Sequence, residues 1–301
     1  MLRVALHAFI LLTFVSPLAW AGSIALTLSD NSGPYAEFSK ALDEALAGTN
    51  WKITASGKSD GTESAAARPD LLVTAGSEAF RQTLARGGTT PVLATLLPRQ
   101  SYERILSDAG RVKARVSTIY LDQPPARQAA FLRQLLPTQK RIGMLVSNET
   151  RPQVSLYRQV FANFGLTLDS EDSDAENTLL PAANALLPRV GVLLAIPDST
   201  IYRRENIKAL LITSYRHQRP VVAFSGAFVN AGALAALFTT PAQIARQTAD
   251  LLVASGTNLP GPMAPSLFAI AINQNVVQAL GLTVPDEATI RRSMLADREA
   301  R

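Results

Sequence analysis

The sequence predicts an α/β protein in which parallel β-sheets are packed between helices in two lobes. Continuous apolar runs, clearest at residues 190–196 and 221–224, end in small polar residues and lead into stretches with helical periodicity. Strands that are apolar without alternation are buried on both faces, which requires helices above and below a parallel sheet. The chain has 301 residues, of which 47% are hydrophobic, and this length favours two lobes over one.

The first part of the chain predicts alternating strands and helices. Five apolar segments read as strands, at residues 23–29, 51–55, 71–75, 91–97 and 116–121. Apolar residues at helical spacing from Tyr35 to Leu46 predict a helix after the first strand. Further helices are expected through Arg86 and near Tyr102, and the small polar residues of segment 57–67 predict a loop.

The run Asp122-Gln123-Pro124-Pro125 interrupts this pattern, because the residue before each proline is extended and a helix can start only after them. We therefore expect the first crossing between the lobes there. The pattern then restarts with helices through Leu136 and from Val154 to Phe164. The strands predicted for this part are residues 141–146, 166–168, 190–196, 221–224 and 233–238.

A second crossing is expected at Thr239-Thr240-Pro241, with Thr240 capping a helix. Residues 256–265 are rich in proline and glycine and predict a linker. A last strand at 267–272 and two further helices complete the chain. These breaks predict lobe 1 as residues 22–121 plus 240–262, and lobe 2 as residues 122–239 plus 263–301.

Residues 1–21 have the three regions of a secretory signal peptide, with Arg3 before an apolar run and Ala19 and Ala21 before a cleavage site. The apolar run is shorter than the ~20 residues of a membrane-spanning helix, which favours cleavage over an uncleaved anchor. We expect a mature chain that begins near Gly22 in the bacterial periplasm. The sequence has no cysteine, which excludes disulfides and an amino-terminal lipid anchor.

The formal net charge of +5 is mild, and the basic residues occur as scattered pairs such as Lys140-Arg141 and Arg203-Arg204. A solvated surface explains such pairs better than a nucleic-acid groove, which needs clustered cations with interleaved aromatic residues. We therefore expect a small-molecule ligand, no nucleic acid and a monomeric protein.

Ligands of parallel sheets lie at the carboxyl ends of the strands, and these ends carry polar residues here. The candidate ligand-binding residues of lobe 1 are Ser29, Asp30, Ser32, Tyr35, Gly76 and Ser77. Those of lobe 2 are Ser147, Asn148, Asp198, Ser199, Phe224 and Ser225. The alternative is ordinary helix capping, for which serine, aspartate and asparagine are common before helices. Tyr35, which follows Gly33-Pro34 directly, is the strongest aromatic candidate for stacking on a ligand ring, ahead of Tyr102, Tyr202 and Phe238.

Enzymatic activity is poorly supported. The mature chain has one histidine, His217, at a helix end where the helix dipole explains it, and no cysteine nucleophile or zinc cluster is possible. Residues 57–61 match G-x-S-x-G with Ser59 as the nucleophile, but no apolar helix follows, as a nucleophile elbow requires. The sequence has neither a phosphate-binding loop nor a dinucleotide fingerprint, so we expect no cofactor and no metal.

Three segments, residues 140–148, 220–237 and 271–285, closely resemble the ABC transporter substrate-binding family, whose better-known members look like tryptophan and tyrosine binders. The resemblance covers most of the mature chain and is strongest after Val116. It implies a type I periplasmic binding protein, in which two flavodoxin-like (Rossmann-like) lobes joined by a hinge close on a small molecule.

We expect capture of an amino-acid-like or carboxylate-bearing molecule, since exposed amides at a helix start, as at Gly76 and Ser77, suit a carboxylate. The resemblance implies that the partner is an ABC-type membrane permease. In amino-acid binders of this family an acid at the position of Asp198 looks suited to pair with a ligand ammonium, and its competing role is to cap the helix containing Tyr202. One alternative is a sensor that presents its closed form to a membrane receptor such as a histidine kinase. A hydrolase using Ser59 is the other.

Overall fold

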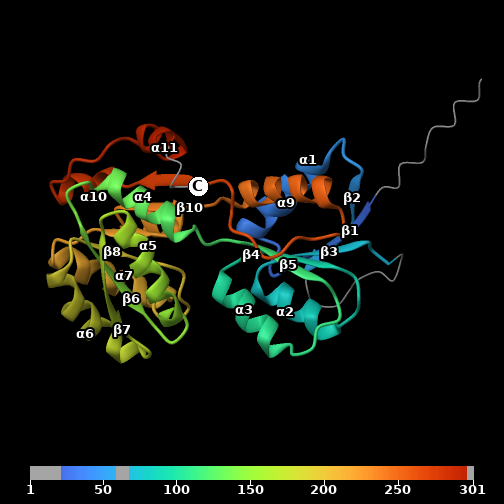
Figure 1. Cartoon of the computed structure of the whole chain (residues 1–301), viewed down its shortest axis with the longest axis horizontal. Helices are drawn as coiled ribbons and strands as arrows, with labels where there is room; N and C mark the ends of the chain where they lie inside the picture. The colour runs from blue at the N-terminus through green and yellow to red at the C-terminus, as the bar shows by residue number, and fades with distance from the viewer. Residues whose placement is uncertain (1–21, 59–67, 297–301) are drawn as a thin grey trace, which may run out of the picture.

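The computed structural model describes residues 22–58 and 68–296, which form two α/β lobes side by side (Figure 1). Lobe 1 is built on a five-stranded sheet in the order β2-β1-β3-β4-β5, and lobe 2 on a six-stranded sheet in the order β11-β10-β9-β8-β6-β7. This arrangement confirms the fold class predicted from the sequence. The predicted signal peptide and Ser59 lie outside the described residues. No helix among the described residues has the length and hydropathy that a membrane crossing requires.

The strands of lobe 1 all pair in parallel. They are β1 (Gly22–Leu28), β2 (Trp51–Lys58), β3 (Leu71–Ala75), β4 (Val92–Leu97) and β5 (Val116–Tyr120). One face of the sheet is covered by α1 (Pro34–Leu46) and α9 (Pro241–Ser255), and the other by α2 (Ser77–Arg86) and α3 (Arg99–Asp108). Both faces are apolar for this reason, as the continuous hydrophobic runs predict.

Helix α9 belongs to lobe 1 although it follows nearly all of lobe 2 in the sequence. It lies alongside α1, and its Ile244 and Leu252 are fully buried in the same cluster as Phe38. The Trp51 indole Nε1 donates a hydrogen bond of 3.0 Å to the Leu252 carbonyl oxygen. Lobe 1 therefore depends on two segments that are far apart in the chain.

Lobe 2 also has helices on both faces of its sheet. Its strands are β6 (Arg141–Val146), β7 (Thr167–Asp172), β8 (Val192–Leu194), β9 (Val221–Ala223), β10 (Ala235–Phe238) and β11 (Ala269–Ile272). One face packs against α4 (Pro125–Leu135), α5 (Val154–Asn163), α10 (Gln274–Ala279) and α11 (Glu287–Ala296). The other packs against α6 (Glu176–Leu186), α7 (Arg204–Arg216) and α8 (Gly226–Asn230). Short 3₁₀ turns lie at Arg151–Gln153 and Leu187–Arg189.

Strand β11 pairs antiparallel with β10, whereas the sequence predicts parallel sheets only. The chain leaves the carboxyl end of β10, which faces lobe 1, and passes through α9 (Figure 1). It then re-enters the lobe 2 sheet at that same end. A strand that enters where its neighbour leaves must run in the opposite direction. The other strand pairs of this sheet are parallel.

Lobe 2 also contains a helix that the sequence pattern did not predict. Helix α6 buries Leu179, Ala183 and Leu186 at helical spacing, but Pro181 within it obscures the pattern. Strand β7 extends to Asp172 instead of ending at Leu168, because its outer residues form an edge strand whose carboxylates pair with arginines.

The lobes are joined by segments 121–125, 239–241 and 256–268, which hydrogen bonds tie to one another. Gln123 Nε2 donates to Thr239 Oγ1, which in turn donates to the Leu267 carbonyl oxygen at 3.2 Å. The third segment also joins the edge of the lobe 1 sheet, since Tyr120 N donates to the Met263 carbonyl oxygen at 2.9 Å. The crossings therefore form one connected hinge.

Asp122 lies within the first crossing and contacts lobe 1. One carboxylate oxygen of Asp122 accepts a hydrogen bond of 2.6 Å from the backbone N–H of Arg99, at the start of α3. Burial of the carboxyl raises the pKa of Asp122 to about 6, in spite of that hydrogen bond. The charged form of Asp122 is thus disfavoured in the folded protein.

Because the pKa of Asp122 is higher in the folded than in the unfolded chain, the folded state holds the proton more tightly, and this contribution to stability is lost as pH rises from about 4 to 6. We expect Asp122→Asn to remove that loss, worth about 1 to 2 kcal/mol after solvent screening of a half-buried group. Urea unfolding from pH 4 to pH 7 measures it.

Asp70→Asn is the matched control for the pH dependence. Hydrogen bonds from Ser23 lower the pKa of Asp70, so its contribution is present above pH 4 and is lost only as pH falls further. The Asp70 variant should keep the slope of stability between pH 4 and pH 6. An Asp122→Asn variant with an unchanged slope would contradict the assignment.

Candidate functional site

A cavity of about 670 Å³ lies between the lobes, at the carboxyl ends of the strands. Lobe 1 contributes the β1–α1 loop and the end of β4, and lobe 2 contributes the ends of β9 and β10. Its lining residues are Gly33, Pro34, Tyr35, Glu37, Leu96, Pro98, Leu121, Pro197, Phe224, Ser225, Gly226, Ala227, Phe238, Thr239, Thr240 and Pro241. The volume is typical of small-molecule sites.

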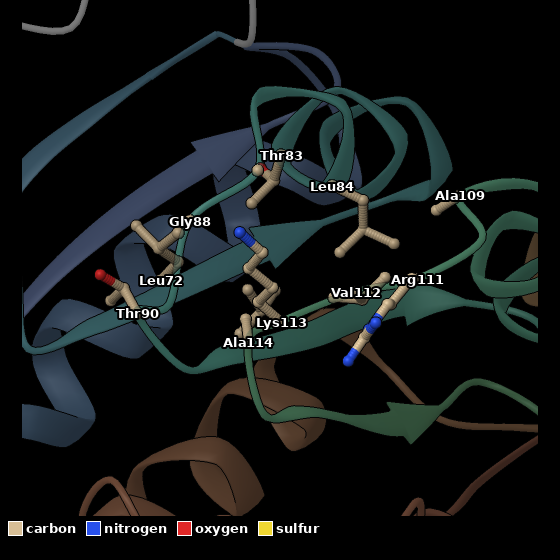
Figure 2. A pocket seen from close by; sticks show the side chains of 12 residues that line it. Leu72, Thr83, Leu84, Gly88, Thr90, Ala109, Arg111, Val112, Lys113 and Ala114 are labelled. Carbon is tan, nitrogen blue, oxygen red and sulfur yellow. The ribbon is translucent and has the colours of Figure 1, made fainter.

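A second, smaller cavity of about 190 Å³ lies at the opposite end of the lobe 1 sheet (Figure 2). Leu72 and Val92, from the amino-terminal ends of β3 and β4, contribute to its wall. The side chains of Arg111 and Lys113 extend in different directions and do not converge on one point (Figure 2). The cavity between the lobes is therefore the candidate site, because it occupies the end of the sheets where ligands of this architecture bind.

Tyr35 forms part of the lobe 1 wall, and Gly76 determines how closely its ring can approach. Gly76 has φ +93°, and a Cβ atom there would lie 2.7 Å from Tyr35 Cε1 and 2.5 Å from Ser29 Oγ. The Ser29 hydroxyl accepts a hydrogen bond of 2.9 Å from Ala79 N in the first turn of α2. Burial, followed by the nearby charge of Asp30, raises the pKa of Tyr35, so its phenol stays neutral.

Phe224 and Phe238 form the aromatic part of the lobe 2 wall. The Phe224 ring belongs to an edge-to-face cluster in which the ring centres of Tyr202, Phe224 and Phe228 lie 5.7 Å apart in each pair. The Phe238 ring packs against Gly226, where an added Cβ would lie 3.4 Å from Cζ. Both rings are half-buried, so each keeps an accessible surface in the cavity.

Leu96 lines the cavity with a backbone conformation that is rare for leucine. Its φ of +53° lies in the left-handed region, and the pairing of β4 with β5 shifts register between Ala94 and Leu97. Such a conformation costs roughly 1 to 2 kcal/mol, and strained residues of this kind concentrate at binding sites. The strain turns the chain at the end of β4 into the cavity wall.

Asp198, predicted as the partner of a ligand ammonium group, is not among the residues that line the cavity. Its side chain is buried and accepts hydrogen bonds from five donors: Ser147 N, Ser147 Oγ, Thr150 Oγ1, Thr200 N and Ile201 N, at 2.6 to 3.1 Å. A carboxylate with this many partners has no oxygen left for a ligand. Asp198 and Ser147 instead hold the loops after β6 and β8 together.

Other predicted site residues are also engaged in local contacts away from the cavity lining. Asn148 N donates to Asp174, and the Ser199 backbone N–H and hydroxyl both donate to Glu149. Asp30 accepts two hydrogen bonds from Ser32 in an exposed turn. Ser77 is the first residue of α2, directly after Gly76, and is not among the residues that line the cavity.

Of the predicted residues, the structure brings Tyr35, Phe224 and Ser225 together around the cavity. The sequence pattern missed Leu96, because nothing in a leucine within an apolar run signals a left-handed backbone. It also assigned Thr239 and Thr240 only to the crossing, although a crossing that starts at a strand end necessarily borders the cleft.

We expect Asp198→Ala to lower the free energy of unfolding by about 3 kcal/mol, because it removes the carboxylate that accepts from two buried backbone N–H groups, of Ser147 and Ile201, and from the partly buried N–H of Thr200. Urea denaturation measures the loss. Asp174→Ala, which removes an exposed ion pair with Arg151 and an exposed acceptor of Asn148 N, should cost much less. A cost for Asp198→Ala no larger than that of this control would contradict the role of Asp198 in holding the two loops together.

Gly76→Ala is expected to lower the free energy of unfolding by roughly 2 to 4 kcal/mol, since the new methyl group collides with Tyr35 and Ser29 in addition to straining the backbone. Gly48→Ala is the matched control, because Gly48 also has positive φ but nothing lies within 4 Å of its added Cβ. It should cost about 1 kcal/mol. Equal costs would show that Tyr35 does not press on Gly76.

Three solved structures share the fold, and each covers most of both chains. A conserved domain protein from Vibrio cholerae has 18% identity and a TM-score of 0.61, covering 91% of this chain and 98% of its own. An ABC domain from Streptococcus pneumonia in complex with L-Trp has 17% identity and a TM-score of 0.60, with coverage of 90% and 98%. The ligand-free, open structure of CD0873, a substrate-binding protein from Clostridium difficile, has 16% identity and a TM-score of 0.67, with coverage of 88% and 96%.

No curated protein matches the chain. The sequence model of one family, described as ABC transporter substrate binding protein, matches residues 60–293. That match spans most of the chain and includes both walls of the cavity from Leu96 onward. The two-lobed fold, the cavity between the facing strand ends and this match lead to one conclusion: the chain belongs to the ABC transporter substrate-binding protein family.

Proposed function

We propose that the protein is a periplasmic solute-binding protein, which captures a small molecule in the cavity between its lobes and delivers it to an ABC-type permease. The cavity at the facing strand ends is the observation that carries the proposal. Family membership supports the transport role, and the signal peptide predicted for residues 1–21 supports the periplasmic location.

Binding in this architecture works by shifting an equilibrium between open and closed lobes. A ligand that contacts Tyr35 of lobe 1 and Phe224 of lobe 2 at once stabilises the closed form, because only that form lets both walls reach it. The hydrogen-bonded crossings at Gln123 and Thr239 act as the hinge. We propose that the protein binds its ligand without converting it.

Asp198 is the residue that the sequence predicts as the partner of the ammonium group of an amino-acid-like ligand. The neighbour from Streptococcus pneumonia in complex with L-Trp supports an amino-acid-like ligand by analogy. The carboxylate of Asp198, however, is saturated by hydrogen bonds of its own lobe. The proposed function is therefore small-molecule binding in the cavity, independent of that carboxylate.

Ligand-induced closure tests the proposal. In a thermal-shift screen of amino acids, carboxylates, nucleosides and neutral ring compounds, a ligand at 100 times its Kd should stabilise the protein by about 2.7 kcal/mol. Small-angle X-ray scattering should then record a smaller radius of gyration with the same ligand. Stabilisation should weaken in Tyr35→Ala and Phe224→Ala, which remove contacts from opposite walls.

Tyr215→Ala is the control for these variants, because Tyr215 is an exposed aromatic residue outside the cavity lining. It should leave the ligand-induced shift unchanged. Binding that is indifferent to Tyr35 and Phe224, or that leaves the radius of gyration unchanged, would refute capture between the lobes.

A further inference from the structure

We infer that the ligand of the cavity is an uncharged small molecule with at least one flat ring, in place of the free amino acid or carboxylate that the sequence suggested. The inference rests on the proposed function, since it concerns the same cavity. It follows from what the two walls present to a ligand: ring faces, proline surfaces and neutral hydroxyl groups.

Aromatic side chains lie on both sides of the cavity. Tyr35 comes from lobe 1, and Phe224 and Phe238 come from lobe 2. Pro98 and Pro197 add rigid apolar surface to the two walls. Lobe closure brings such surfaces toward each other, and a flat ring is the shape that can contact both through its two faces.

The hydroxyl groups in the wall are neutral and keep donors for a ligand. Ser225 Oγ accepts a hydrogen bond of 3.2 Å from Phe228 N, and Thr240 Oγ1 accepts one of 3.2 Å from Gln243 N. In both cases the hydroxyl is the acceptor, so its own O–H can donate to a carbonyl, hydroxyl or ring nitrogen. Thr239 differs, because its hydroxyl already donates to the Leu267 carbonyl oxygen.

The charges around the cavity oppose a carboxylate. Among the described residues that line it, the one aspartate or glutamate is the exposed Glu37, and none is lysine, arginine or histidine. A ligand carboxylate would therefore lose water without gaining a cation, beside a group of the same charge. An ammonium group could meet only Glu37, where solvent screens the attraction.

The charged residues in the loops that follow β6 and β8 of lobe 2 form hydrogen bonds and ion pairs with other protein groups. Asp198 is saturated by its own loops, and Arg151 pairs with Asp172 and Asp174 at 2.8 and 2.7 Å. Glu149 accepts from Ser199 and lies 3.8 Å from Arg104 of lobe 1. These charges organise the loops and do not line the cavity.

A matched series of ring compounds tests the inference by calorimetry on the mature protein. Tryptophol is neutral, indole-3-acetate anionic, tryptamine cationic and L-tryptophan zwitterionic, and all four share one ring system. Adenosine and adenosine monophosphate form a second neutral and charged pair. In each set that binds, the neutral compound should bind at least about tenfold tighter than its charged relatives.

A charged compound that binds as tightly as its neutral relative would overturn the inference. So would a protein that binds amino acids or carboxylates but no neutral ring compound, and that result would leave the proposed function intact. If no compound in the thermal-shift screen or in these sets binds or closes the lobes, both the inference and the proposed function fail.

Two variants with a control give a second readout. Ala227, on the exposed part of the wall, can accept an arginine without disturbing a buried residue. Ala227→Arg should raise the affinity for indole-3-acetate about tenfold relative to tryptophol, because it supplies the missing cation. Ala231→Arg, on an exposed residue outside the lining, should leave that relative affinity unchanged.

Phe238→Leu should weaken the binding of tryptophol about tenfold, because it removes a ring from the lobe 2 wall. Unchanged preferences in Ala227→Arg and unchanged affinity in Phe238→Leu would refute a ring site at this wall.

Discussion

The direction in which the chain leaves its two sheets determines where the cavity and the hinge lie and how the last strand runs. Strand β5 of lobe 1 ends at Tyr120 and β10 of lobe 2 ends at Phe238, and at each of these ends the chain crosses to the other lobe. Since the strands of each sheet up to these crossings are parallel, all their carboxyl ends face the opposite lobe. The cavity, the hinge beside it and the reversed direction of β11 all follow from that one constraint.

Much of the fold could be predicted because it depends on patterns that a sequence displays directly. Buried parallel strands are uninterrupted apolar runs, and prolines mark both the first crossing and the start of α9. Helix α6 escaped prediction because Pro181 lies inside it, and the packing of Leu179 and Leu186 against the sheet outweighs the proline. The direction of β11 was beyond local pattern, since it depends on the return of the chain from the other lobe.

The position of the site could be predicted from the sequence, but only some of the residues that line it could. Strand ends identify where polar and aromatic residues gather, and Tyr35, Phe224 and Ser225 were found in this way. A sequence does not reveal which carboxylates turn back onto their own backbone, and Asp198 does so with two amides of its own loop. Ser147 and Thr150, from a distant part of the chain, donate the remaining hydrogen bonds to this carboxylate.

The dependence of lobe 1 on α9 has a consequence for how the protein is made. Ile244, Ala249 and Leu252 are part of the core that also holds Phe38 and Leu42. The amino-terminal half of the chain cannot complete this core until the ribosome has synthesised residues up to about Ser255. A core whose last component is synthesised late keeps lobe 1 incomplete until most of the chain exists.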